Sequence, residues 1–128
     1  MPIEPAADHP TFELGGNAIT SYIAPDRGGV ECVLYRVDTP PGVGLPPHHH
    51  DRLDTFLVVA GGGLWHMDDD ATERATGDSV VVPVGVRHYL EAGPEGCSFL
   101  VTMLVDTKMF LDDGTVFVPS WVGSEHRS

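Results

Sequence analysis

Three histidines from two separate parts of the chain have the residue type and spacing of metal ligands. His48 and His50 lie two positions apart, so an extended backbone points both side chains to one side and His49 to the other. Asp54 begins the next apolar segment, and His88 lies in an otherwise apolar segment where an inward-facing polar group needs a partner. Imidazoles and a carboxylate bind divalent transition metals, so these side chains are candidate ligands of one ion.

The candidate ligands belong to two motifs with regular spacing. The first has five, one, three and six residues between its positions: Gly42, His48, His50, Asp54 and Gly61. The second has five, one and two residues between its positions: Gly77, Pro83, Gly85 and His88. The two motifs, at 42–61 and 77–92, resemble the two signatures of the cupin superfamily in the same order. Two positions depart from the cupin pattern: Asp54 replaces the usual Glu, and Ala92 replaces the usual Asn.

This resemblance implies a fold and a ligand set. It implies an all-β, single-domain protein, a cupin jelly-roll β-barrel (double-stranded β-helix), that holds one divalent transition metal ion per chain. By position in the motifs, His48, His50 and His88 would bind that ion, with Asp54 as the fourth ligand. The candidate ions are Fe, Ni, Mn, Cu and Zn, and the sequence does not select among them.

Asp54 leaves several arrangements open. Aspartate is one methylene shorter than glutamate, which removes about 1.5 Å of reach against metal–oxygen distances of about 2.0–2.2 Å. The strand can move inward so that Asp54 binds the ion directly, or Asp54 can bind a water on the ion. It can also accept a hydrogen bond from an imidazole N–H and thereby fix the tautomer of that ring. We expect direct ligation.

Around the candidate ligands we expect a mostly apolar substrate pocket. The following side chains are predicted to line it: Tyr35, Phe56, Trp65, His66, Phe99, Val101 and Met103. An ion held by imidazoles and at most one carboxylate keeps coordination positions open for a substrate. We therefore predict a metal-dependent small-molecule enzyme, a dioxygenase acting on a flavonol, a diketone or another enolisable or aromatic substrate. The alternatives are a non-redox metal-assisted cyclase, isomerase or lyase in natural-product metabolism, and a non-catalytic ligand-binding cupin.

Short segments of alternating or β-branched residues, separated by turn formers, are typical of a β-sandwich or a barrel. They predict strands at 18–23, 30–37, 53–60, 64–68, 79–82, 86–90 and 98–105. The glycine-rich segments 61–63 and 93–96 are predicted to be turns between strands. We expect an N-terminal arm at 1–17, the cupin barrel at 18–105, and a C-terminal tail at 106–128 that packs on the barrel or on a partner subunit.

Composition limits the partners. The chain has 128 residues, enough for one domain, and a net charge of −12, which repels nucleic acid and anionic membrane surfaces. Its longest uncharged apolar segment, 56–65, is half of the roughly 20 residues needed to span a bilayer. The N-terminus lacks the features of a secretory signal, so we expect a cytoplasmic protein.

Cys32 and Cys97 are expected to be reduced and buried. Exposed strand edges predict a homodimer.

Overall fold

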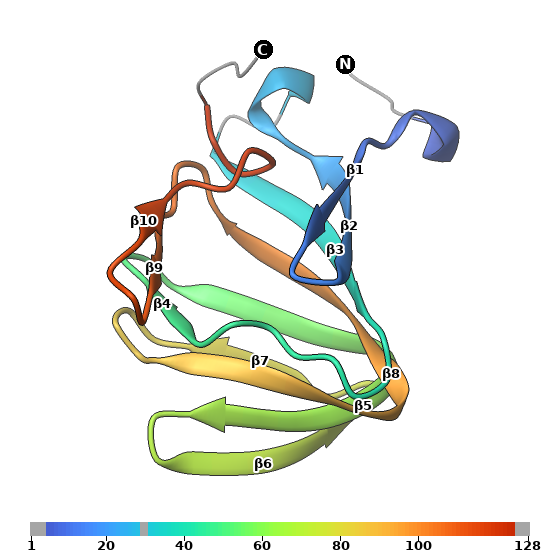
Figure 1. Ribbon diagram of the computed structural model, residues 1–128. Helices are drawn as coiled ribbons and strands as arrows, with labels where there is room; N and C mark the ends of the chain where they lie inside the picture. Colours follow the sequence, from blue (N-terminus) through green and yellow to red (C-terminus); the bar gives the residue numbers. More distant parts are fainter. Residues whose placement is uncertain (1–4, 29–30, 125–128) are drawn as a thin grey trace.

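The computed structural model describes residues 5–28 and 31–124, and these form a curled sheet of antiparallel strands (Figure 1). The described residues include two 3-10 helices, η1 (Ala6–Asp8) and η2 (Pro25–Arg27). The strands are β1 (Thr11–Leu14), β2 (Asn17–Ile23), β3 (Cys32–Thr39), β4 (His48–His50), β5 (Asp54–Met67), β6 (Asp70–Ala75), β7 (Ser79–Val82), β8 (His88–Leu104), β9 (Met109–Leu111) and β10 (Val116–Phe117). The predicted all-β jelly-roll fold is confirmed. Within the described ranges we find no helix with the length and hydropathy needed to cross a membrane.

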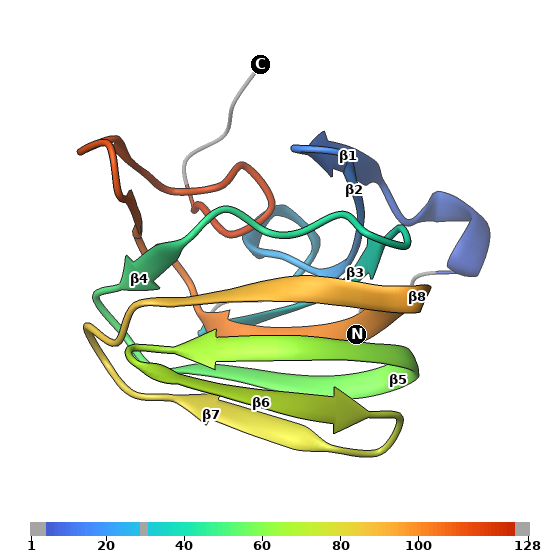
Figure 2. The same ribbon diagram turned by 60° about the horizontal axis from the view of Figure 1, so that its bottom comes forward.

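The long strands β5 and β8 bend together and thereby curl the sheet. The first part of β5 pairs with β7 and with the end of β8, whereas its last part pairs with β6 and with the start of β8. β8 also pairs with β3 and β4, which gives the strand order β1-β2-β3-β8-β4-β9-β10. The bend leaves β6 and β7 as neighbours in space, and each of them pairs only with β5 (Figure 2).

The prediction of turns at 61–63 and 93–96 was wrong, because both segments continue a strand. The register of β5 against β8 shifts within 61–63, at the point where the two strands bend. A Cβ on Gly61 would lie only 2.1 Å from the carbonyl oxygen of Gly96. The glycine is therefore required because two backbones approach too closely for any side chain, and the chain does not reverse there.

Strand β6 was not predicted. Its side chains are exposed apart from Arg74, which is half-buried, so no alternation of apolar residues marks it in the sequence. It is a strand because its backbone pairs along β5, from Met67 opposite Asp70 to Gly62 opposite Ala75. Long-range pairing therefore decides the conformation of this segment.

Both segments outside the predicted barrel contribute to the sheet. The segment predicted as an arm contains β1, which pairs with β2. The segment predicted as a tail contains β9 and β10, which pair with each other, and β9 also pairs with β4. Beyond them, Trp121 and Val122 are 7% and 0% exposed. The tail thus packs against the barrel of its own chain.

The core fills the space inside the curled sheet. Along β3, alternate residues are buried, as period-2 patterning requires: Val33, Tyr35, Val37 and Thr39. The Phe56 ring packs against Trp65 and Phe99, with ring centroids 4.8 Å and 5.5 Å apart. Burying one such side chain stabilises the fold by roughly 1.5–3 kcal/mol. This aromatic layer fixes the strands that carry the histidines.

The two cysteines differ in environment. Both are free thiols, but Cys32 is exposed at the start of β3, whereas Cys97 is buried in β8. The prediction that both are buried is therefore wrong for Cys32. Burial raises the pKa of the Cys97 thiol to about 11.

Candidate metal centre

The ends of three strands bring the candidate ligands together. His48 and His50 are the first and last residues of β4, His88 begins β8, and Asp54 begins β5. In the pairing of β4 with β8, His48 lies directly opposite His88. The alternation of side chains along β4 buries both of its outer histidines. Four side chains from distant parts of the sequence thus meet at one end of the barrel.

The three imidazoles form a compact, buried cluster. One ring nitrogen from each of His48, His50 and His88 lies within 4.8 Å of the others. The exposed fractions of these residues are 4%, 6% and 1%. Three imidazole nitrogens at this spacing can hold a metal ion.

Each of these rings donates its Nδ1–H to a backbone carbonyl. The hydrogen bonds are His48 to Pro46 at 2.7 Å, His50 to Lys108 at 3.0 Å, and His88 to Val86 at 2.9 Å. A carbonyl oxygen can only accept a hydrogen bond, so the proton of each neutral ring lies on Nδ1. The Nε2 lone pairs are left free to bind a cation, and the backbone fixes the orientation of the rings.

Asp54 lies on the Nε2 side of the cluster. Its Oδ2 is 3.0 Å from Nε2 of His50 and 3.6 Å from Nε2 of His88, and its side chain is 1% exposed. Its Oδ1 accepts the backbone N–H of Thr55. Because all three Nδ1 atoms bond to carbonyl oxygens, Asp54 does not accept an Nδ1 proton in this structure. Direct ligation and binding through a ligated water are the arrangements that this geometry leaves open.

Burial and neighbouring groups set the charges of the site. Burial lowers the pKa of His48 to about 3, with the His88 and His50 rings acting in the same direction, so His48 is neutral. Burial alone would raise the pKa of Asp54, but the adjacent His50 and His88 rings outweigh burial and lower that pKa. The site therefore offers a neutral imidazole and an ionised carboxylate at neutral pH.

The donor set fits a divalent transition metal. Nε2 of His88 is buried and has no hydrogen-bond partner within the described part of the chain. Nε2 of His50 faces the Asp54 carboxylate at 3.0 Å, and two acceptors at that distance need a proton or a cation between them. A set dominated by imidazole nitrogen suits Fe, Mn, Ni, Cu or Zn better than Mg or Ca, which prefer oxygen ligands.

Two further histidines near the cluster point away from it. His49 is half-buried on the other face of β4, and its ring stacks on Phe110 with centroids 4.8 Å apart. The His66 ring stacks on Tyr89 at 4.1 Å, and its Nε2 lies 3.0 Å from the Glu91 carboxylate. His66, which was predicted to line the substrate pocket, is absent from the lining of the cavity beside the cluster.

A cavity of about 30 Å³ adjoins His48, His50 and Asp54. Four of the predicted pocket residues line it: Tyr35, Phe56, Phe99 and Val101. Trp65 and Met103 were also predicted to line it, but neither is among the residues that do. Both are buried, and Trp65 lies behind the Phe56 ring. The prediction for Trp65 was wrong because Trp65 lies beyond the bend in β5. Inward-facing residues before and after that bend face different spaces.

Part of the cavity wall comes from segments that sequence reasoning placed outside the barrel. Leu14 of β1, Met109 of β9, and Pro119 and Trp121 beyond β10 line the cavity. The Trp121 ring centroid is 5.9 Å from that of Tyr35. The apolar residues near the chain ends were a signal that these segments pack, but no local pattern showed where they pack.

The chain is similar in sequence to proteins with different activities. Residues 35–103 match the family model Cupin_2, described as a cupin domain. Over 57 residues the chain is 33% identical to a gentisate 1,2-dioxygenase of Haloferax sp, covering 44% of this chain and 15% of that protein. Over 69 residues it is 32% identical to the dimethylsulfoniopropionate lyase DddW of Ruegeria pomeroyi, covering 54% of this chain and 45% of that protein. The matched segments thus span less than half the length of either relative.

A solved structure agrees with the fold. The polyketide cyclase RemF from Streptomyces resistomycificus has a TM-score of 0.72 and 22% identity, covering 94% of this chain and 89% of that chain. The match to the family model spans more than half of the sequence, from β3 to the end of β8, and includes all four candidate ligands. On this evidence the chain belongs to the Cupin_2 family of cupin-domain proteins.

Proposed function

We propose that the protein is a metal-dependent dioxygenase acting on a small diketone or another small enolisable or aromatic substrate, with His48, His50, His88 and Asp54 as ligands. The observation that carries this proposal is the orientation of the imidazoles, whose Nε2 atoms converge because backbone carbonyls hold every Nδ1–H. When bound, a divalent transition metal supplies Lewis-acid and redox chemistry at positions that the protein leaves open.

The polar groups of the cavity suit an anionic form of the substrate. A dication held by neutral imidazoles and one ionised Asp54 leaves a net charge of about +1, which favours an enolate over its neutral ketone. Burial, followed by the negative charge of Asp54, raises the pKa of Tyr35, so its hydroxyl keeps its proton. That hydroxyl can therefore donate a hydrogen bond to a substrate oxygen.

The cavity volume limits the substrate. About 30 Å³ holds a water molecule or an ion but not a flavonol. Any substrate larger than a water molecule requires the wall to move, and a small diketone requires less movement than a flavonol. We therefore favour the small diketone over the flavonol.

The second candidate is a lyase that cleaves a small substrate without oxygen. The observation favouring it is the 32% identity to a dimethylsulfoniopropionate lyase, which extends over 54% of this chain. The same residues serve this reaction. Removal of a proton next to a carbonyl forms an enolate, and stabilising that enolate requires a Lewis acid but no redox change.

The test is to load the purified protein separately with Fe²⁺, Mn²⁺, Ni²⁺, Cu²⁺ and Zn²⁺ and to measure oxygen uptake. Acetylacetone and gentisate test the dioxygenase, and cleavage of dimethylsulfoniopropionate tests the lyase. We expect oxygen uptake with a redox-active metal, its loss in His88→Ala, and its retention in the matched control His66→Ala. Substrate cleavage without oxygen uptake would establish the lyase instead. Turnover that is unchanged in His88→Ala would refute both.

A further inference from the structure

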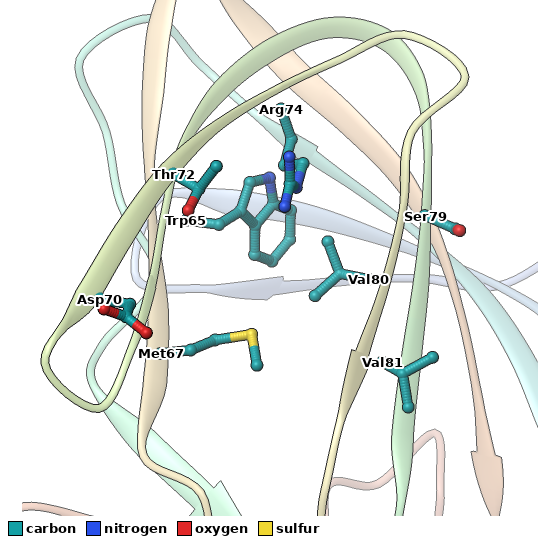
Figure 3. Close-up of a pocket in the computed structure, with 8 residues that line it drawn as sticks. All are labelled: Trp65, Met67, Asp70, Thr72, Arg74, Ser79, Val80 and Val81. Atoms are coloured by element: carbon teal, nitrogen blue, oxygen red, sulfur yellow. The ribbon is translucent and has the colours of Figure 1, made fainter.

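A second pocket lies between β6 and β7, away from the histidines (Figure 3). Its volume is about 290 Å³, close to the lower end of the roughly 300–1,000 Å³ typical of ligand pockets. It exists because β5 bends at 61–63, so that β6 and β7 pair with different parts of β5 and not with each other. It shares no lining residue with the cavity beside the metal centre.

The indole of Trp65 carries an unused hydrogen-bond donor at this pocket. Trp65 is 3% exposed, and its Nε1 is buried with no hydrogen-bond partner in the described ranges. An indole N–H can only donate, so it needs an acceptor from a ligand or a solvent molecule. In Figure 3 the nitrogen edge of the indole lies at the same end of the pocket as the guanidinium of Arg74.

Arg74 has no carboxylate partner among the described residues. Its guanidinium donates a long hydrogen bond, 3.4 Å, to the carbonyl oxygen of Glu73, its neighbour in the chain. Arg36 and Arg87 pair with carboxylates at 2.9 Å and 2.8 Å, whereas the exposed Arg52 donates to the carbonyl of Val105. The chain has 19 acidic and seven basic residues, so a half-buried guanidinium without a carboxylate is unexpected. Such a fork of donors matches the geometry of a carboxylate ligand.

We propose that this pocket binds a small organic carboxylate with an apolar body. The carboxylate accepts hydrogen bonds from the guanidinium of Arg74 and from Nε1–H of Trp65, and the apolar body lies along Met67 and Val80. Asp70 lies near Met67, at the end of the pocket opposite the guanidinium (Figure 3). Its negative charge disfavours an anion at that end, so the lining sets the orientation of the ligand.

This carboxylate site is separate from the metal centre but shares a wall with it. The Trp65 ring stacks on Phe56 with centroids 4.8 Å apart, and Phe56 lines the cavity beside the histidines. The two spaces therefore lie on opposite sides of one aromatic layer. Binding at the Arg74 end requires none of the metal ligands, so it is independent of the proposed enzymatic reaction.

Benzoate titration tests the proposal, with benzamide as the neutral analogue of similar shape. In a Trp121→Phe protein, Trp65 is the remaining tryptophan, so its fluorescence reports on this pocket; calorimetry on the otherwise unchanged, metal-loaded protein gives an independent reading. We expect saturable benzoate binding that persists when EDTA removes the metal, and much weaker binding of benzamide. Arg74→Gln should weaken benzoate binding at least about tenfold, as for a lost charge-assisted hydrogen bond.

The matched control is Arg36→Gln, which removes the same charge from β3 and should leave benzoate binding unchanged. Three results would overturn the proposal: no saturable binding at tens of millimolar benzoate, equal binding of benzamide, or full retention of binding in Arg74→Gln. Binding that disappears with EDTA in every variant would also overturn it, because the metal centre would then be the site.

Discussion

Oδ2 of Asp54 lies 3.0 Å from Nε2 of His50, the ring nitrogen that the C-terminal segment leaves free. The carbonyl of Lys108 accepts the Nδ1–H of the same ring at 3.0 Å, and the N–H of Lys108 donates to Asp51 at 2.9 Å. A loop that is 58 residues away in sequence therefore decides which nitrogen of His50 faces the carboxylate. This is why the candidate site depends on the folded tail as well as on the two motifs.

Replacing one imidazole of the cluster should abolish tight metal binding. We predict that His50→Ala weakens binding of Zn²⁺ or Mn²⁺ at least about 100-fold, because supporting residues alone are worth about 10–100-fold. His49→Ala is the control, since that ring lies on the opposite face of β4 against Phe110. Calorimetric titration of the metal-free protein measures both. Equal losses in the two variants would show that the cluster does not bind the ion.

The charge of Asp54 should contribute to metal affinity. We predict that Asp54→Asn lowers the affinity at least about tenfold while the protein remains folded, because the amide keeps the shape but loses the negative charge. Asp69→Asn, in an exposed turn between β5 and β6, is the control and should have no effect. Unchanged affinity in Asp54→Asn would assign the carboxylate a structural role.

Two glycine substitutions should distinguish the stability cost of close backbone approach from the cost of a left-handed backbone conformation. Gly61 and Gly77 both have positive φ, +65° and +93°, but a Cβ on Gly77 would meet nothing within 4 Å. We predict that Gly77→Ala costs about 1–2 kcal/mol from the conformation alone. Gly61→Ala should cost more, about 3 kcal/mol or above, because its Cβ would overlap the carbonyl of Gly96. Urea unfolding measures the difference, and similar losses would contradict the proposed reason for the bend.

The two thiols should react at very different rates. Burial raises the pKa of Cys97 to about 11, so at pH 8 its thiolate is scarce as well as inaccessible. We therefore predict that a thiol reagent rapidly modifies one thiol per folded chain, the exposed Cys32. Colorimetric thiol counting should show that Cys32→Ser removes the fast phase and Cys97→Ser retains it. Rapid modification of two thiols would mean that β8 opens readily around Cys97, where it pairs with Gly61.

The sequence determined the features that depend on local backbone geometry. β-Branched or alternating segments predict β7 at its observed bounds and β3 to within two residues, because such residues fit the pleated backbone of a strand. Alternation of side chains along a strand separates His49 from His48 and His50. The spacing of the two motifs indicates the family from the sequence alone, since turns and ligands recur at fixed distances along the chain.

Tertiary structure decided the features that depend on contacts between distant segments. Strand β6 has no apolar face and forms through pairing with β5, and the glycines at 61–63 bend a strand that they were expected to end. Trp65 consequently lies at the pocket between β6 and β7, on the far side of Phe56 from the histidines. The tail fixes the tautomer of His50 through the Lys108 carbonyl, and it supplies Trp121 to the cavity wall. No local pattern encodes these placements, because each depends on which distant backbone or side chain fills the neighbouring space.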